Sequence, residues 1–277
     1  MGTLGSLHLR SSCLLDDRIY RSDMGVGKMN YKLGKTSRTI KRGTLQIENY
    51  LDFPTLEQNY PLPAKVDYLT KPGQFSIAGN SDYGDCVVAG AAHMIQVCTA
   101  TAGKMQTIPD KTVINTYFNL TGGPDCGLNL MDFLKFWKDT GFPGHKIGAY
   151  AAVNPKNVKA VKYANYLFGG LYIGLELPRT AQIQDIWQMT EHGMLVDGAN
   201  RGSWGGHCVN GGYCDDSFIK VVTWGAVKAM TWDFLFNYCD EIYAIIMLEW
   251  FTAAHKTPHG IAWKDLLVDL GKVSRLP

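Results

Sequence analysis

The spacing of apolar positions predicts a helical half of the chain followed by a strand-rich half. Helices are expected at residues 86–101, 110–119, 128–140 and 158–168. In the third of these segments, Leu130, Phe133, Leu134 and Trp137 recur at helical spacing. The segment 86–101 carries a run of small residues at 89–92, which allows neighbouring elements to approach closely. We therefore expect it to be a central helix.

Alternating and continuous apolar runs in the second half predict strands at residues 171–177, 207–213, 218–223 and 241–247. Asp215 and Asp216 form a turn between two of them. Helices followed by strands indicate an α+β fold made of two subdomains. The junction between the subdomains is then the natural place for a site, with Cys86 on the helical wall and His207 on the sheet wall.

The composition is that of a compact globular protein. The 277 residues are 46% hydrophobic and 12% aromatic, enough for one two-layered domain with an extension. No apolar run approaches the eighteen residues of a membrane span, and the N-terminus lacks the hydrophobic region of a secretory signal. We therefore expect a cytoplasmic protein, in a host cytoplasm or a virion if a phage encodes it.

Positive charge is concentrated at the N-terminus. Residues 1–42 carry nine Lys or Arg against three acidic residues and show no sustained periodicity. We interpret residues 1–62 as a basic arm, 63–250 as the folded domain and 251–277 as a tail that packs on it. Three roles for the arm stay open: a propeptide, an arm that binds an acidic partner or nucleic acid, and a solubilising extension.

The seven cysteines form an odd set without CxxC spacing, which is typical neither of a disulfide scaffold nor of a zinc module. A reducing compartment fits better. Cys208 adjoins His207, but neighbouring strand residues face opposite sides, so the two side chains would not share a metal ion. We expect no metal and no cofactor.

The strongest candidate for chemistry is Cys86, which directly precedes the run of apolar and small residues of the predicted central helix. A helix N-terminus and a nearby imidazolium both stabilise a thiolate. His207 begins an apolar strand after Gly205 and Gly206, and we expect Cys86 and His207 to rest as a thiolate–imidazolium pair. His93 lies about 10 Å further along the same helix and is interpreted as a hydrogen-bonded core residue.

Several segments, in this order, resemble the papain-like cysteine peptidases over roughly residues 63–250. They are Pro63-Ala-Lys-Val66-Asp67, Asn80 six residues before Cys86, Cys126-Gly127 with the helix after it, the strand around Leu171, His207, and Trp224-Gly225. The resemblance implies a papain-like two-subdomain fold, with a central helix that starts at the cysteine and an antiparallel, barrel-like sheet subdomain. It also places Asn80 where the family has its oxyanion-hole glutamine.

Four positions depart from the family pattern. Val222 stands where the family has the asparagine that orients the histidine, Asn80 is one methylene shorter than glutamine, and Val87 replaces a tryptophan. Tyr83 occupies the position of the cysteine that would pair with Cys126. The chain is therefore interpreted as a divergent relative from the poorly characterised bacterial or phage branch.

The resemblance implies a cysteine hydrolase that acts on a peptide or protein substrate bound between the subdomains. Cys86 is the expected nucleophile, His207 the general base, and Asn80 an oxyanion donor. Thr223 is a candidate for orienting the histidine and Trp224 for shielding it. The alternative is the same fold with weak or no activity, used as a structural or binding module such as a virion component.

Overall fold

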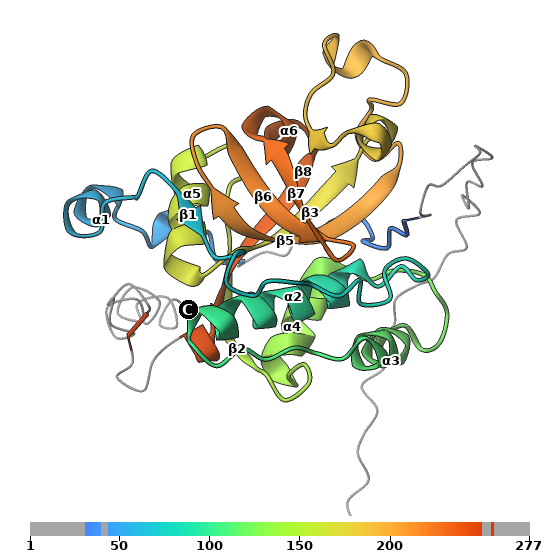
Figure 1. Ribbon diagram of the computed structural model, residues 1–277, viewed down its shortest axis with the longest axis horizontal. Helices are drawn as coiled ribbons and strands as arrows, with labels where there is room; N and C mark the ends of the chain where they lie inside the picture. Colours follow the sequence, from blue (N-terminus) through green and yellow to red (C-terminus); the bar gives the residue numbers. More distant parts are fainter. Residues whose placement is uncertain (1–30, 40–43, 251–255, 258–277) are drawn as a thin grey trace, which may run out of the picture.

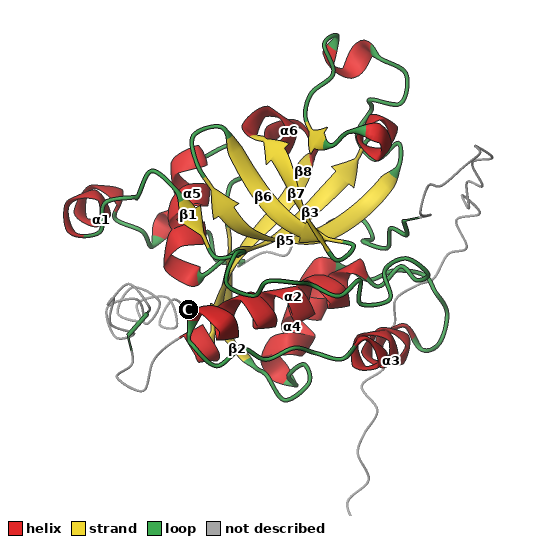
Figure 2. Cartoon of the chain, viewed as in Figure 1, coloured by secondary structure: helices red, strands yellow, loops and turns green. Residues whose placement is uncertain are grey.

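The computed structural model describes residues 31–39, 44–250 and 256–257 (Figure 1). It has an α+β fold, in which helices pack against one large, mostly antiparallel sheet (Figure 2). The predicted fold class is therefore confirmed. The C-terminal tail 251–277 and residues 1–30 of the basic arm lie outside the described residues, apart from positions 256–257.

Four of the helices α1 to α6, namely α1, α4, α5 and α6, begin at a residue whose side chain caps the first turn. Asn129 and Asn157 cap α4 and α5 by accepting a hydrogen bond from the backbone N–H three residues on, and α5 ends at Gly169 in the left-handed conformation. In chain order the helices span Phe53–Asn59, Cys86–Thr101, Asp110–Thr121, Leu130–Asp139, Val158–Phe168 and Trp232–Tyr238.

The described strands form a single sheet in the order β2-β8-β3-β5-β6-β7-β4, with β1 paired to β5. All these pairs are antiparallel except β4 with β7. Strands β1 to β8 span Val66–Asp67, Ile147–Ala152, Leu171–Leu177, Ile186–Trp187, Gly205–Cys214, Phe218–Thr223, Ala226–Thr231 and Cys239–Met247.

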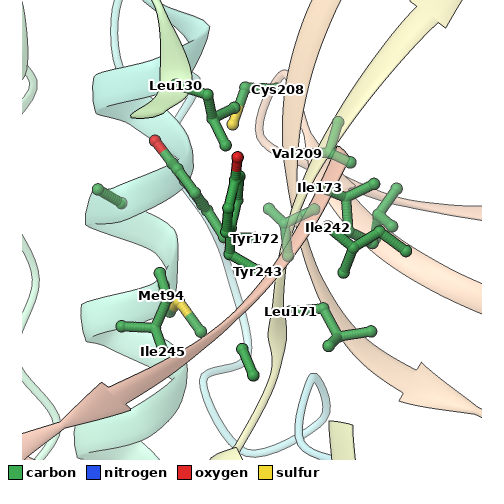
Figure 3. Packing of buried hydrophobic residues seen from close by; sticks show 14 of the residues in the cluster. Met94, Leu130, Leu171, Tyr172, Ile173, Cys208, Val209, Ile242, Tyr243 and Ile245 are labelled. Atoms are coloured by element: carbon green, nitrogen blue, oxygen red, sulfur yellow. The ribbon is translucent and has the colours of Figure 1, made fainter. Parts of the chain in front are cut away.

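Helix α2 is the centre of the core. Its first fourteen residues are all buried, and it lies with α4 on one side of the sheet (Figure 1). A Cβ added at Gly90 would lie 3.1 Å from the Tyr172 ring and 3.3 Å from Cys208 Sγ, so the small residue lets β3 and β5 approach closely. Tyr172 points from the sheet toward α2 (Figure 3) and donates a hydrogen bond to the Val87 carbonyl.

The elements expected from the sequence are present, and several were not expected. The helices at 86–101 and 158–168 and the strands at 171–177 and 218–223 have the expected bounds. Helices α1 and α6 and strands β1, β2, β4 and β7 were not expected. Strands β1 and β4 have two residues each, β7 is only half buried, α1 has no buried residue, and α6 is a short aromatic-rich helix without a long apolar period. None of the helices in the described residues is long and apolar enough to cross a membrane.

Candidate active site

Cys86 is the first residue of α2 and is buried, with 1% of its surface exposed. Burial raises the pKa of its thiol to about 12, although backbone hydrogen bonds from Cys208 and Gly34 act in the opposite direction. The helix N-terminus therefore does not produce a thiolate in this arrangement. The sequence-based expectation of a resting thiolate is wrong for the described state, because the surroundings exclude water.

His207 lies on β5, and its Nε2 is 2.7 Å from Thr223 Oγ1 on the neighbouring strand β6. Burial lowers the pKa of the imidazole to about 3, and Nδ1 is buried without a hydrogen-bond partner among the described residues. The ring is therefore neutral at neutral pH. The expectation of an imidazolium is therefore also wrong for the described state, because burial disfavours the charged ring.

Trp224 covers the imidazole. Its ring stacks on His207 with the ring centroids 4.3 Å apart. Trp224 and Gly225 join β6 to β7, and both have positive φ, at 46° and 76°. Two such residues make the tight hairpin turn that matches the strand twist, and this turn holds Trp224 over the site. Trp187 and Trp204 pack against it in turn.

Asn80 is buried just before α2, but its amide is bound to the backbone. Its Nδ2 donates to the Tyr83 carbonyl at 3.1 Å and to the Lys32 carbonyl at 3.4 Å. Trp224 Nε1 donates to the same Lys32 carbonyl at 3.1 Å. Asn80 and Trp224 thus act together as donors toward one carbonyl oxygen, which belongs to the N-terminal arm.

The arm crosses the site as an extended peptide. We call residues 31–39 the strap; they are drawn in blue in Figure 1. On the sheet side, the Lys35 N–H donates to the Gly206 carbonyl at 3.0 Å. On the helical side, the Leu128 N–H donates to the Gly34 carbonyl at 2.8 Å and the Thr36 N–H to the Leu128 carbonyl at 3.0 Å. The strap is therefore hydrogen-bonded to both walls.

Glycines on both walls make this close approach possible. A Cβ added at Gly127 or at Gly206 would collide with a strap carbonyl, that of Gly34 or of Lys35 respectively. Gly127 also has a φ of +73°, which favours glycine. Cys126-Gly127 and Gly205-Gly206 therefore provide a narrow backbone channel in which an extended chain fits.

The strap contacts both Cys86 and the tryptophan that covers His207. Among the described residues, no hydrogen bond joins Cys86 to His207. The Gly34 backbone bonds to Cys86, and Tyr31 stacks on Trp224 with the ring centroids 4.3 Å apart. Because the strap occupies the space over the thiol, the described state is closed.

Asp85, which the sequence analysis passed over, is completely buried next to Cys86. Burial raises the pKa of its carboxyl to about 8, and neither carboxyl oxygen has a hydrogen-bond partner among the described residues. The carboxyl is therefore mostly protonated at neutral pH. The sequence does show that Asp85 directly precedes the predicted helix. It does not show that the carboxyl is buried and therefore neutral, because burial depends on tertiary packing.

Within the described part of the chain, no group of three or more His, Cys, Asp or Glu residues is arranged to hold a metal ion. The chemistry open to the site is that of a thiol, an imidazole and amide donors.

Comparison with known proteins defines the fold. No protein-family model and no curated protein matches the sequence. Among solved structures, xylellain, a cysteine protease from Xylella fastidiosa, superposes with a TM-score of 0.60 at 15% identity, over 80% of this chain and 98% of its own. Procathepsin B S9 from Trypanosoma congolense gives 0.53 at 12% identity, over 78% and 86%. Procathepsin L 3 of Tenebrio molitor gives 0.52 at 11%, over 78% and 76%.

Proposed function

We propose that this chain, whose fold is papain-like, is a cysteine hydrolase of peptide or isopeptide bonds that the strap holds closed. The observation that carries the proposal is the backbone pairing of residues 34–36 with Gly206 and Leu128 directly over Cys86. A site that binds an extended polypeptide across a thiol at a helix N-terminus is suited to attack on a peptide carbonyl.

Removal of the strap is the first step of the proposed mechanism. Water then reaches Cys86 and His207, and the desolvation that keeps both groups neutral is relieved. With Nε2–H donated to Thr223 Oγ1, the free Nδ1 lone pair is the basic atom that takes the Cys86 proton. Thr223 thereby orients the His207 imidazole, a role that Val222 cannot take because its side chain is apolar.

The chemical steps then follow from these groups. The Cys86 sulfur attacks the substrate carbonyl, and the oxyanion accepts hydrogen bonds from the Asn80 amide and the Cys86 N–H. His207 returns its proton to the leaving amine as the C–N bond breaks, leaving a thioester. Water, deprotonated by His207, hydrolyses the thioester and releases the acid and the thiol. The Lys32 carbonyl, bound by Asn80 and Trp224, marks a place where the site accepts a carbonyl oxygen.

A second function is supported by the neutral, buried state of Cys86 and His207. If the strap never leaves, the chain is a papain-like structural or binding module with weak or no activity, for example in a virion. The basic charge of residues 1–42 separately predicts an acidic partner or nucleic acid. Residues 31–39 of that arm are engaged with this chain in the described state.

A peptide that carries a thiol-reactive electrophile tests the proposal. The full chain, Lys35→Ala to loosen the strap, and Lys35→Ala with His207→Ala are each treated with the probe and with a pool of quenched fluorescent peptides. We expect Cys86 labelling and peptide cleavage with Lys35→Ala and the loss of both without His207. Lys159→Ala, which breaks the exposed pair with Glu57, is the control and leaves Cys86 labelling and cleavage as they are in the full chain. Labelling without cleavage would support the binding module instead.

A further inference from the structure

The Lys35 side chain of the strap enters a closed acidic site in the sheet wall. Its Nζ lies 2.6 Å from Asp240 Oδ2 and 3.1 Å from Glu241 Oε1, and the side chains of Lys35, Asp240 and Glu241 are 1%, 9% and 1% exposed. Both carboxylates stand at the start of β8. We call Gly174, Asp240, Glu241 and Tyr243 the acidic site.

The acidic site is shaped by residues other than Lys35. Tyr243 donates a hydrogen bond to Glu241 Oε2 at 2.9 Å and so holds that carboxylate in place. On β3, a Cβ added at Gly174 would collide with Lys35 Cε and would lie 2.7 Å from Glu241 Cγ. The absence of a side chain at Gly174 therefore leaves room for a long, unbranched chain that ends in a cation.

Two carboxylate oxygens of the acidic site keep acceptor capacity. Asp240 Oδ1 is buried and has no hydrogen-bond partner among the described residues, and Glu241 Oε1 has only its ion pair with Lys35. A lysine ammonium group has three donors and a guanidinium group has five. The site thus has more acceptor capacity than Lys35 uses, which suits the larger number of donors on a guanidinium group.

The charges make an empty acidic site unfavourable. Burial alone would lower the pKa of Lys35, but Asp240 and Glu241 raise it above its ordinary value. Burial also raises the pKa of Glu241, in spite of the neighbouring ammonium. Two buried carboxylates without a cation are costly, so departure of Lys35 leaves a site that requires another positive group.

The acidic site has a fixed place along the strap. Lys35 directly follows Gly34, whose backbone bonds to Cys86, and its own N–H bonds to the Gly206 carbonyl. Any extended peptide that takes these backbone bonds presents one side chain to the acidic site while an adjacent residue lies at the thiol. The acidic site can therefore bind the side chain of one substrate residue next to the reacting bond.

On the premise of the proposed function, we infer that the acidic site selects substrates with a lysine or arginine beside the bond that is cleaved. In the closed state Lys35 takes the place of that residue. The acidic site thereby serves both to hold the strap and to define the substrate class.

Binding to the acidic site can be measured without any hydrolysis. Lys35→Ala removes three carbons and the ammonium group, a fragment equivalent to n-propylammonium. In the full chain with Lys35→Ala and Cys86→Ala, we expect n-propylammonium to raise the melting temperature in a saturable way, with at least tenfold tighter binding than n-propanol. Adding Asp240→Asn and Glu241→Gln should abolish the difference. Lys159→Ala, which breaks the exposed pair with Glu57, is the control, and n-propylammonium should not raise its melting temperature in this way. Equal binding of both compounds would overturn the inference.

Peptide cleavage completes the test. With Lys35→Ala and Cys86 intact, a peptide carrying lysine or arginine should be cleaved at least tenfold faster than its norleucine analogue. Cleavage without this preference overturns the acidic site's role but leaves the proposed hydrolase intact. Selective binding of n-propylammonium with no cleavage of any peptide overturns the hydrolase and, with it, the substrate assignment, and leaves only a cation site that anchors the strap.

Discussion

His207 Nε2 on β5 lies 2.7 Å from Thr223 Oγ1 on the neighbouring strand β6. The neighbouring residue Val222 is buried and has no polar side-chain atom to take this role. Successive strand residues face opposite sides, so only one member of the pair Val222 and Thr223 can reach the imidazole. The side chain that contacts this ring nitrogen is thus a hydroxyl rather than an amide.

The first prediction concerns this hydroxyl. In a strap-loosened background such as Lys35→Ala, Thr223→Val should lower kcat roughly 10- to 100-fold, because the ring loses a hydrogen bond worth about 1–3 kcal/mol when buried. KM should change little, since Thr223 does not touch the substrate. Thr223→Ser keeps the hydroxyl and should restore most of the rate. Equal rates for the valine and serine variants would show that the contact does not orient the ring.

The second prediction concerns the reactivity of Cys86. In the unmodified chain, a small alkylating agent should modify the partly exposed Cys126 faster than Cys86, because Cys86 is buried and its pKa is raised to about 12. Lys35→Ala should increase the Cys86 rate at least about tenfold, since only the thiolate reacts and the strap keeps water away. Mass spectrometry after timed labelling measures both sites. Lys159→Ala is the matched control and should leave the Cys86 rate unchanged.

The third prediction concerns release of the strap by steric means. Gly174→Val places methyl groups where Lys35 Cε and Glu241 Cγ lie, so it should expel the lysine. Trypsin should then cut after Lys32 and Lys35, bonds that the closed strap protects. Cleavage after the exposed Lys104 is an internal control and should proceed at the same rate in both proteins. Continued protection of the strap would show that the acidic site is not its main anchor.

The fourth prediction concerns pH. The pKa of Asp85 is raised from 3.8 to about 8, so the folded protein keeps a proton that the unfolded chain loses. The contribution of Asp85 to the free energy of unfolding is therefore greatest below about pH 4, falls as pH rises toward 8, and is level above that. Asp85→Asn removes this term and should stabilise the protein by a few kcal/mol at pH 8 but little at pH 4.

Thermal unfolding of the unmodified chain and of the Asp85→Asn variant between pH 4 and 8 provides the measurement. His207, whose pKa is lowered to about 3, acts with the opposite sign: its contribution is present above pH 6.5 and is lost as pH falls toward 3. Because both proteins contain His207, the difference between their curves isolates Asp85. A difference that does not grow between pH 4 and 8 would contradict the raised pKa.

Local sequence patterns were sufficient for the main scaffold. The apolar period and small residues of 86–101 predicted a buried central helix, and the strand at 171–177 has the predicted bounds. These features depend on side-chain spacing within a few residues, which is readable without tertiary contacts. The order of cysteine, glycine and histidine motifs was likewise sufficient to suggest the papain-like fold that the structural comparison shows.

Long-range contacts decided the state of the site. The sequence indicated a thiolate and an imidazolium, but burial by segments far along the chain keeps both groups neutral. In the sequence Lys35 was one of nine positive residues in an arm without periodicity, and its partner Asp240 lies 205 positions away. Desolvation and ion pairing depend on which segments meet in space, and only the tertiary structure determines that for the strap and the acidic site.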